Sequence, residues 1–342
     1  EYLLPKNKEM LKNMGIDKLI YPEVLAATEI VQSLKRSWIR EYRTFSNEAL
    51  VLVCVKVREN AEIINKVFST GFFNHSMYRI VAVKRHTTTI IPSGNDQILA
   101  NDLVYFICSK ENLEYVRTAA GKTNFEIKNI IIMGGSKIAL KTVQYLPNDI
   151  DVKIIESDRE KCYKLADKTD TLIIHGDGRN IDLLKDEGIE DADAFIALTD
   201  NSETNVLACL AAKRFGIRKT IAELENIDYI DLADNLDIGT LINKKLIAAS
   251  HIYQQTLDED AYDVQCLTYS DAEVVEFAVK AGDKITHDRV RNLNLPDDVN
   301  IGGVVRNGKG YVVNGNSVIL PGDHVVIFCK ATAVPKLAKF FN

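Results

Sequence analysis

The 342-residue sequence is poor in cysteine, and the cysteines it has are widely dispersed. There is no CxxC pair and no Cys/His spacing of the kind that binds zinc, so neither a disulfide framework nor a zinc fold is indicated. Thiols in this arrangement are expected to be reduced and packed in the interior, which suits a reducing cytoplasm. The six are Cys54, Cys108, Cys162, Cys209, Cys266 and Cys329.

Long apolar runs are absent too. No stretch approaches the roughly 20 residues that cross a bilayer, and the acidic opening Glu1-Tyr-Leu-Leu-Pro does not resemble a signal peptide. Basic residues are not in excess either: 42 Lys and Arg against 48 Asp and Glu give a net charge of −6. That balance disfavours a nucleic-acid binder. A globular protein long enough for two or three domains remains.

An internal repeat organises the chain. Residues 17–30 align with 239–252 at a shift of 222, and residues 94–108 align with 315–329 at a shift of 221. Shared secondary-structure patterning could mimic part of this agreement, but not identical residues at fixed spacing. The identical pairs include Gly94/Gly315, Asn95/Asn316, Asp102/Asp323 and Cys108/Cys329.

The repeat predicts a chain that begins inside its first copy. A unit that starts near residue 130 has its counterpart about 90 residues ahead of residue 1, and residue 1 is not Met. We therefore expect the tail of a first nucleotide-binding domain, its small partner domain, and then a complete second pair. The corresponding ranges are 1–37, 38–122, 127–257 and 258–342.

Short apolar runs alternate with helical stretches between residues 128 and 252. Runs that are apolar almost throughout are typical of strands in a parallel sheet covered on both faces. Strands that alternate with helices predict an α/β fold with a Rossmann-like doubly wound parallel sheet. The expected strands are 130–133, 152–155, 171–174, 194–198 and 219–224.

The turn after the first of these strands carries part of a dinucleotide-binding pattern. A GxGxxG turn that starts at Gly134 would have its other glycines where the chain has Ser136 and Ala139. Gly134 suits the tight turn and Ala139 permits close helix packing, whereas a side chain at Ser136 crowds the place where backbone approaches a pyrophosphate. By itself the turn is compatible with a working site or with a structural relic of one.

Glu156 favours the interpretation of this turn as a working nucleotide site. It ends the second strand 22 residues after Gly134, where an acidic residue accepts hydrogen bonds from ribose hydroxyls and disfavours a 2′-phosphate. Its alternative role is that of a solvated strand-end carboxylate. Residues 175–180 and 199–205 follow the third and fourth strands and place small and acidic residues at the edge where open parallel sheets bind ligands.

The segments MGGSKIA, IIESD, HGDGRN and ALTDNSETN, in this order and spacing, resemble the nucleotide-binding domain of the RCK (KTN) family. The duplicated arrangement is similar to the tandem RCK regulatory subunits of bacterial potassium uptake, over essentially the whole chain. The resemblance implies a cytoplasmic, nonenzymatic subunit that controls potassium transport. It also implies gating by NAD+ or NADH, or by ATP, ADP or AMP. A TrkH-like membrane subunit would hold it at the inner face of the plasma membrane, as a dimer or tetramer.

The same resemblance implies roles for individual residues. Those from Gly134 to Ile138 would bind the dinucleotide phosphates, and Glu156 the adenosine ribose. Two later pairs would line the adenine side and the nicotinamide side, respectively. The implied set is Gly134, Gly135, Ser136, Lys137, Ile138, Glu156, Asp177 and Gly178 (adenine), and Thr199 and Asp200 (nicotinamide).

Glu223 and Glu225 match in position a glutamate pair with which some RCK domains bind divalent cations. Two carboxylates fill too little of a calcium coordination shell. A solvated strand end is therefore the favoured interpretation, and we expect no metal site.

The two small domains, 38–122 and 258–342, resemble RCK C-terminal domains of the α+β class. In the second, Asn307-Gly308 and Asn314-Gly315 predict hairpin turns, and Pro321-Gly322-Asp323 predicts a tight turn. Alternating apolar positions predict one buried face, against a helix or a partner subunit. The preceding helical segment, 243–257, would present Leu246, Ile247, Ser250 and Tyr253 to a partner subunit or to its own sheet.

No catalytic constellation accompanies the nucleotide pattern. An oxidoreductase needs a proton donor or a hydride acceptor beside the nicotinamide, and no histidine pairs with an acid in a recognisable motif. We therefore expect a protein that senses a nucleotide, with an NAD-dependent oxidoreductase carrying a small substrate domain as the alternative. The six histidines are His75, His86, His175, His251, His287 and His324.

Overall fold

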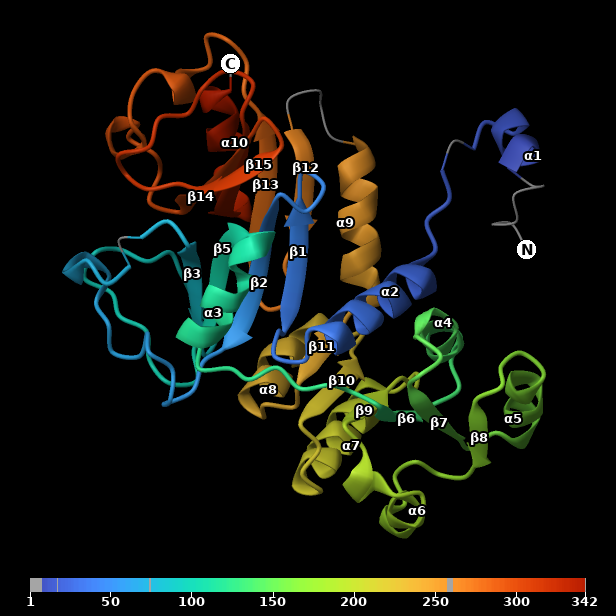
Figure 1. The fold of residues 1–342 in the computed structure, drawn as a ribbon. Coiled ribbons are helices and arrows are strands. Elements are labelled where there is room, and N and C mark those ends of the chain that lie inside the picture. Colours follow the sequence, from blue (N-terminus) through green and yellow to red (C-terminus); the bar gives the residue numbers. More distant parts are fainter. Residues whose placement is uncertain (1–7, 17, 74, 257–260, 342) are drawn as a thin grey trace.

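Three β-sheets make up the computed structural model, which describes residues 8–16, 18–73, 75–256 and 261–341 (Figure 1). One sheet has six strands, and two have five strands each. The six-stranded sheet carries helices on both faces, and the two five-stranded sheets are antiparallel. The predicted fold class, a Rossmann-like sheet with duplicated small α+β domains, is confirmed.

The six-stranded sheet is parallel throughout, in the order β11-β10-β9-β6-β7-β8. This is the strand order of dinucleotide-binding folds, and the order reverses between neighbours β6 and β9. The five predicted strands are all present, and β11 is an addition. The strands are β6 (Asn129–Met133), β7 (Asp151–Glu156), β8 (Leu172–His175), β9 (Ala194–Ala197), β10 (Lys219–Glu223) and β11 (Thr240–Ile242).

Helices divide between the two faces of this sheet. α4 and α5 share one apolar core with the sheet, and α6 and α7 share the other. In folds of this type such a division, on either side of β6 and β9, places the ligand site at the carboxyl ends of the strands. The helices are α4 (Lys137–Tyr145), α5 (Arg159–Ala166), α6 (Ile181–Asp186), α7 (Ser202–Arg214) and α8 (Ile230–Asn235).

A helix from the first copy covers the sheet of the second. α2 (Pro22–Lys35) lies against α4 and α9 (Lys244–Thr256), while α1 (Lys8–Asn13) stands apart (Figure 1). The apolar stripe of α2 shares a core with strands β6, β7, β9, β10 and β11, so burial of that stripe ties the two copies together. The buried residues of the stripe are Ala26, Ala27, Ile30, Val31 and Leu34.

The side chains predicted to share one face of α9 have different surroundings. Ile247 is buried in the core with α2, Leu246 is half-buried against the opposite core, and Ser250 accepts a hydrogen bond from the Cys266 amide at 3.2 Å. Tyr253 is exposed. Ile247 therefore packs on the chain's own sheet, one of the two alternatives expected for this helix, and its contact with a partner subunit stays a prediction.

The two five-stranded sheets are copies of each other. Both have the order first-second-fifth-third-fourth, and the third strand of each carries a bulge at the equivalent position. The first copy contains β1 (Glu41–Phe45), β2 (Leu50–Lys56), β3 (Tyr78–Arg85), β4 (Thr88–Ile90), β5 (Leu103–Ser109) and α3 (Leu113–Ala119). The second contains β12 (Ala261–Cys266), β13 (Ala272–Ala278), β14 (Val299–Arg306), β15 (Lys309–Val312), β16 (His324–Lys330) and α10 (Val334–Leu337).

The aspartates matched by the repeat occupy the same buried position in each copy. Asp102 accepts hydrogen bonds from Arg85 Nε at 2.9 Å and Nη2 at 2.8 Å, and from the Leu99 amide at 2.8 Å. Asp323 accepts from Arg306 Nε and Nη2, both at 2.7 Å, and from the Leu320 amide at 2.8 Å. The matching sequence therefore encodes a matching ion pair between the third strand and the loop before the fifth.

The copies also pack against each other. The Tyr105 and Phe328 rings lie 5.6 Å apart, and Arg79 donates to Asn300, the residue at its own equivalent position, at 2.9 and 3.1 Å. A Cβ at Gly310 would lie 2.1 Å from the Ala49 carbonyl oxygen, so the backbones approach too closely for any side chain there. The expected buried face is thus covered by the other copy within the same chain.

Two of the three predicted turns in the second copy are confirmed. Asn307 and Gly308 both have positive φ between β14 and β15, as a two-residue hairpin requires. Gly322 has φ 87° in the turn before β16. The hairpin at Asn314-Gly315 is wrong: β15 ends at Val312 and β16 begins only at His324, so this turn lies inside a loop.

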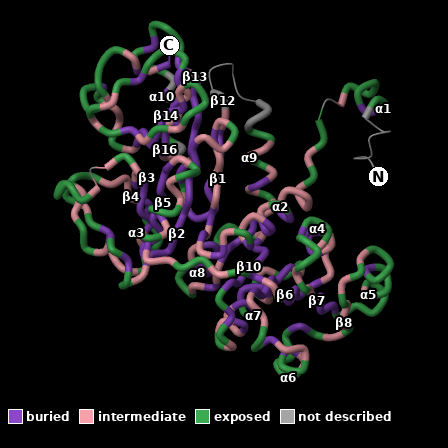
Figure 2. Tube along the Cα trace, in the orientation of Figure 1, coloured by how far each residue is buried: buried purple, intermediate pink, exposed green. Residues whose placement is uncertain are grey.

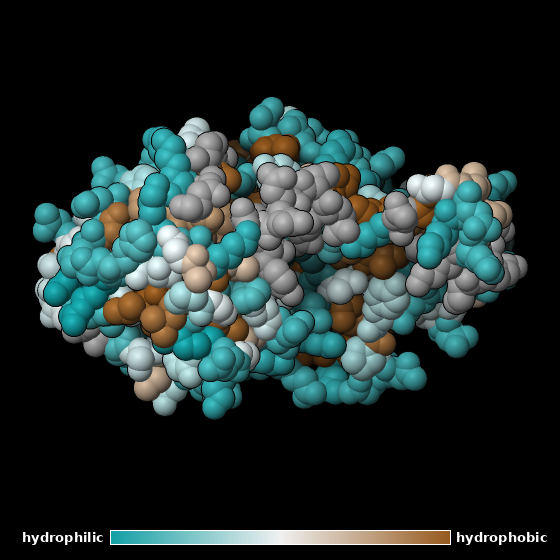
Figure 3. Space-filling view, turned by 90° about the horizontal axis from the view of Figure 1, so that it is seen from above, coloured by the Kyte–Doolittle hydropathy of each residue, from teal (hydrophilic) through white to brown (hydrophobic). Residues whose placement is uncertain are grey.

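Burial follows the sheets, with α5 and α6 at the exposed edge (Figure 2). Four cysteines are buried and two, Cys162 and Cys266, are half-buried, so the expectation of interior thiols holds for four of six. Burial raises the pKa of Cys108, Cys209 and Cys329 to about 12. No helix in the described part of the chain has the length and apolarity to cross a membrane. On the face in Figure 3, hydrophilic residues surround separate hydrophobic patches.

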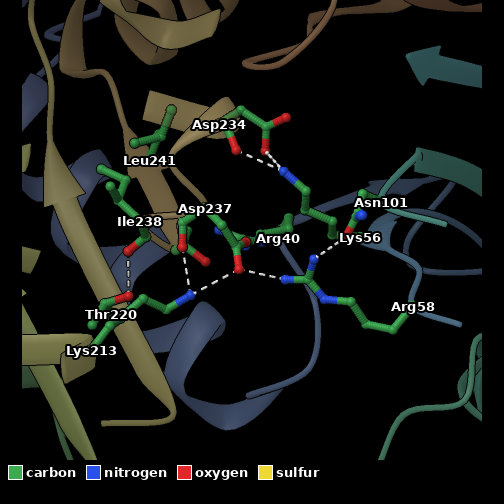
Figure 4. A network of polar contacts seen from close by, with 12 residues as sticks. Arg40, Lys56, Arg58, Asn101, Lys213, Thr220, Asp234, Asp237, Ile238 and Leu241 are labelled. Carbon is green, nitrogen blue, oxygen red and sulfur yellow. Dashed lines mark hydrogen bonds and ion pairs between the residues drawn. The ribbon is translucent and has the colours of Figure 1, made fainter. Parts of the chain in front are cut away.

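One carboxylate joins the first small domain to the Rossmann sheet (Figure 4). Asp237 pairs with Arg40 at 2.5 Å, with Lys213 at 3.1 Å and with Arg58. Burial alone would raise the pKa of Asp237, but these three cations outweigh it and hold the pKa at about 2. The carboxylate therefore stabilises the junction at neutral pH.

We expect Asp237→Asn to lower the free energy of unfolding at pH 7 by about 1–2 kcal/mol, a range reduced for the partial exposure of the pair. Because the folded pKa lies below the unfolded one, this stabilisation is present above about pH 4 and disappears as the pH falls to about 2. Denaturant unfolding at several pH values measures it. Asp170→Asn, at an exposed aspartate, is the control; equal effects of the two variants at pH 7 would contradict the assignment.

Candidate functional site

The turn after β6 meets the end of β9 where the strand order reverses. Gly134 has φ 98°, and its amide donates to the Ile155 carbonyl at 2.8 Å. A Cβ at this residue would lie 2.9 Å from backbone atoms of Leu198 and Thr199. The positive φ and the close approach of the Leu198 and Thr199 backbone both require glycine at this position. The tight turn predicted for Gly134 is therefore present.

Ser136 caps the helix that follows the turn. Its Oγ accepts a hydrogen bond from the Ala139 amide at 3.2 Å, and Ala139 itself is fully buried. The side chain thus satisfies one first-turn amide, while the other early amides of α4 lack intrahelical partners and suit an anion. Lys137 is exposed, whereas the Ile138 side chain is buried, so Ile138 can offer a ligand only its backbone.

Glu156 connects the turn to the end of β7. Its Oε2 accepts from the Gly135 amide at 2.8 Å, and its Oε1 accepts from the Asp158 amide at 2.8 Å and from Ser157 Oγ at 3.3 Å. Only 7% of Glu156 is exposed, so it is not a solvated strand-end carboxylate. Carboxylate oxygens have about four lone-pair sites, so the group keeps acceptor capacity for a hydroxyl.

The segment after β8 supplies one small and one charged residue. Gly178 is buried, and a Cβ on it would lie 2.4 Å from Met133 Cγ at the end of β6. Asp177 is exposed and pairs with Arg179 at 2.7 Å; this hydrogen-bonded guanidinium lowers the pKa of Asp177. Gly135 is packed as tightly as Gly178, because a Cβ there would lie 2.3 Å from Leu165 Cδ1.

Asn205 organises the segment after β9 and was missed in the sequence. It is fully buried; its Oδ1 accepts from the Thr199 amide at 3.1 Å and from Thr199 Oγ1 at 2.7 Å. Its Nδ2 donates to the carbonyls of Thr199 and Glu223, both at 2.9 Å. Asp200 is exposed beside this arrangement. The available signal was a polar residue on the inward face of α7.

Lysines surround the glutamate pair considered for a metal. Lys244 Nζ lies 3.1 Å from Glu223 and 2.5 Å from Glu225, and Lys245 Nζ lies 3.1 Å from Glu225. Burial raises the pKa of Glu223 although Lys244 opposes the shift. Within the described ranges no three His, Cys, Asp or Glu side chains are grouped to hold a metal ion. His175 is exposed, with Nε2 3.1 Å from the Ser157 carbonyl.

The described geometry therefore gathers the turn at Gly134, the Glu156 carboxylate and the segments at Gly178 and Thr199 around the carboxyl ends of adjacent strands. Two family models match the chain: the TrkA-N domain matches residues 130–244, and the TrkA-C domain matches residues 52–121 and 274–342. The chain belongs to the TrkA family. The double TrkA-C match agrees with the duplicated small sheets.

Relatives named Trk system potassium uptake protein TrkA align with almost the whole chain. The protein from Halomonas elongata is 28% identical over 336 residues, which are 96% of this chain and 73% of the relative. The protein from Haemophilus influenzae is 28% identical over 351 residues, which cover 100% of this chain and 76% of the relative. TrkA homolog 1 from Methanosarcina mazei is 25% identical over 332 residues, which cover 96% of this chain and 74% of the relative.

Solved structures of RCK proteins share the fold. The RCK domain of GsuK has a TM-score of 0.53 at 13% identity and covers 98% of this chain and 73% of its own. The GsuK channel bound to NAD has a TM-score of 0.51 at 12% identity, and the match covers 98% of this chain and 61% of the channel chain. At such identities the likeness establishes architecture alone.

Proposed function

We propose that this chain is a regulatory subunit of potassium transport whose conformation depends on an adenine nucleotide bound at the Gly134 turn. NAD+ or NADH is the favoured ligand, with ATP, ADP or AMP as further candidates. Its output is a change of shape passed to a TrkH-like membrane subunit from the cytoplasmic side. Membership of the TrkA family and the potassium-uptake names of the relatives support the transport role.

The buried Glu156 carboxylate, held against the Gly135 amide, is the observation that carries the proposal. It lies where a ribose hydroxyl approaches in dinucleotide folds and disfavours a 2′-phosphate. The amides from Ser136 to Ile138 would receive the phosphates, since helix N-termini favour anions. Asp177 and Gly178 would line the adenine side, and Thr199 and Asp200 the nicotinamide side. The GsuK channel of the same fold, bound to NAD, supports nucleotide binding in general.

A nucleotide can regulate only through a difference in its affinity for two conformations. The proposal therefore requires two ligands, such as NAD+ and NADH or ATP and ADP, that bind the chain's conformations unequally. The α2–α9 contact and the packed small sheets join both copies in one body. A change at the crevice would thus reach segments from one end of the chain to the other.

We expect Glu156→Gln to weaken NADH binding about 10- to 100-fold, because a hydrogen bond to a charged group is worth about 1.5–3 kcal/mol. Glutamine keeps the side-chain volume but loses the charge and one acceptor. Isothermal titration calorimetry with NAD+, NADH, ATP and ADP measures the change. Glu160→Gln, on the exposed first turn of α5, is the matched control. Equal affinities of both variants would mean that Glu156 does not contact the ribose.

A further inference from the structure

A cavity lies at the end of the Rossmann sheet opposite the Gly134 turn. It has a volume of about 240 Å³ and is lined by Lys219 and Thr240, the first residues of β10 and β11. The strands are parallel, so this is the amino-terminal edge of the sheet, whereas the Gly134 turn follows a carboxyl-terminal edge. The first small domain and the connection around residues 121–125 form the remaining walls.

Positive charge dominates the lining of this cavity, which we term the junction cavity. Of the described residues that line it, seven are cationic and none is Asp or Glu. They come from four separate parts of the chain, so no single run of sequence reveals them. The seven are Arg40, Lys56, Arg58, Lys122, Lys213, Arg218 and Lys219.

Two carboxylates outside the lining neutralise some of these cations (Figure 4). Asp234 pairs with Lys56 at 3.0 Å, and Asp237 pairs with three others. These two carboxylates pair with four of the seven basic side chains, so the lining keeps an excess of positive charge. Arginine carries its donors in a planar fork suited to phosphate or carboxylate oxygens.

Three basic side chains have no carboxylate partner among the described residues. Lys219 is 4% exposed and donates to the Ile39 carbonyl at 3.0 Å and to Thr240 Oγ1 at 3.1 Å; burial and then the charge of Arg40 lower its pKa well below the usual value, which disfavours its charged form. Arg218 is exposed and lies over the Phe125 ring at 3.9 Å. Burial and then the neighbouring Arg58 and Arg40 lower the pKa of Lys122 to about 8, so its half-buried charge is costly unless an anion lies beside it.

We propose that the junction cavity binds a small polyanion that carries phosphate groups, of about the size of pyrophosphate. Such a ligand supplies acceptors for Lys122 and Arg218 together, beside the Arg40 and Arg58 guanidinium groups. It would connect the first small domain, the 121–125 connection and the Rossmann sheet, and so fix the angle between them. The site is separate from the nucleotide crevice and does not depend on it.

The repeat indicates that part of this charge is particular to the first copy. The Arg85–Asp102 pair recurs as Arg306–Asp323, as a structural feature of the fold would. By contrast, the positions equivalent to Arg40 and Lys56 in the second copy are Tyr262 and Ala278, whereas Arg58 has a basic counterpart in Lys280. Arg40 and Lys56 are therefore not required by the fold of the small domain.

Calorimetric titration of the 342-residue chain with inorganic pyrophosphate at low, constant ionic strength tests the proposal. We expect saturable binding that Lys122→Met weakens at least about tenfold, the equivalent of 1.4 kcal/mol. The same variant should raise the Tm of the ligand-free chain, because it removes a charge crowded by Arg58 and Arg40. Lys168→Met, at an exposed lysine, should change neither quantity.

Absence of saturable pyrophosphate binding, or equal affinities of the Lys122 and Lys168 variants, would overturn the proposal. Arg218→Gln gives an independent loss of affinity if Lys122→Met folds poorly. ADP titrated into the Glu156→Gln variant distinguishes the source of the phosphates. ADP binding that a further Lys122→Met substitution abolishes indicates that the junction cavity holds the phosphate tail of a nucleotide. Binding of pyrophosphate but not of ADP indicates that it holds a free anion. Because Glu156→Gln should leave pyrophosphate affinity unchanged, failure at one site is separable from failure at the other.

Discussion

Asp323→Ala and Asp102→Ala are each expected to lower the free energy of unfolding by about 2–4 kcal/mol. Each aspartate is almost fully buried and accepts three hydrogen bonds, two from an arginine and one from a backbone amide. Removing it leaves that amide unsatisfied. The expected loss stays below that of a fully buried pair because the arginine side chains are 30% and 36% exposed and can reach water.

Similar losses in the two copies would support the structural equivalence that the repeat implies. Denaturant unfolding followed by circular dichroism measures both variants. Asp271→Ala, at an exposed aspartate ahead of β13, is the control and should cost less than about 0.5 kcal/mol. If only one of the two buried aspartates mattered, the second small sheet would not use the same ion pair to fix its loop.

Gly134→Ala is expected to lower the free energy of unfolding by about 2–4 kcal/mol and to abolish measurable NADH binding. The left-handed conformation alone costs about 1–2 kcal/mol for a residue with a Cβ. The rest arises because that Cβ would lie 2.9 Å from the backbone of Leu198 and Thr199, which cannot rotate away. Separation of the β6 turn from β9 would displace Glu156 through the Gly135 amide.

The control variant Gly216→Ala separates the cost of the left-handed conformation from the cost of steric contact with the added Cβ. Gly216 has φ 89° at the end of α7, but a Cβ there would have nothing within 4 Å. It should therefore lose only the conformational part, about 1–2 kcal/mol, and bind NADH normally. A Gly134 variant that is no less stable than the Gly216 variant would mean that the two strand ends are not in contact.

The sequence predicted features that depend on neighbouring residues. Five strands of the Rossmann sheet appeared as short apolar runs, and the Gly134 turn and Glu156 followed from their spacing to those runs. β11 was missed because three residues, Thr240–Ile242, are too few to form such a run. Ser136 caps α4, a role that a pattern of glycines cannot reveal, and the crowding of a ligand by its side chain stays a prediction.

Features that depend on distant residues could not be predicted in this way. The apolar stripe of α2 indicates a buried face, but nothing near it in sequence identifies the sheet of the other copy as its partner. Asn205 contacts Thr199 and Glu223 only because β9 and β10 end side by side. The junction cavity likewise gathers residues from Arg40 to Thr240.

The central claim is that the crevice beside Gly134 and Glu156 holds an adenine nucleotide without consuming it. Titration of the chain with NADH, followed by calorimetry and by the nicotinamide absorbance of the same sample, tests it most directly. The account predicts saturable binding with one equivalent per chain and an absorbance that stays constant, also when small carbonyl acids are added. Absence of binding at millimolar NADH would contradict the nucleotide site, and oxidation of NADH would identify an oxidoreductase instead.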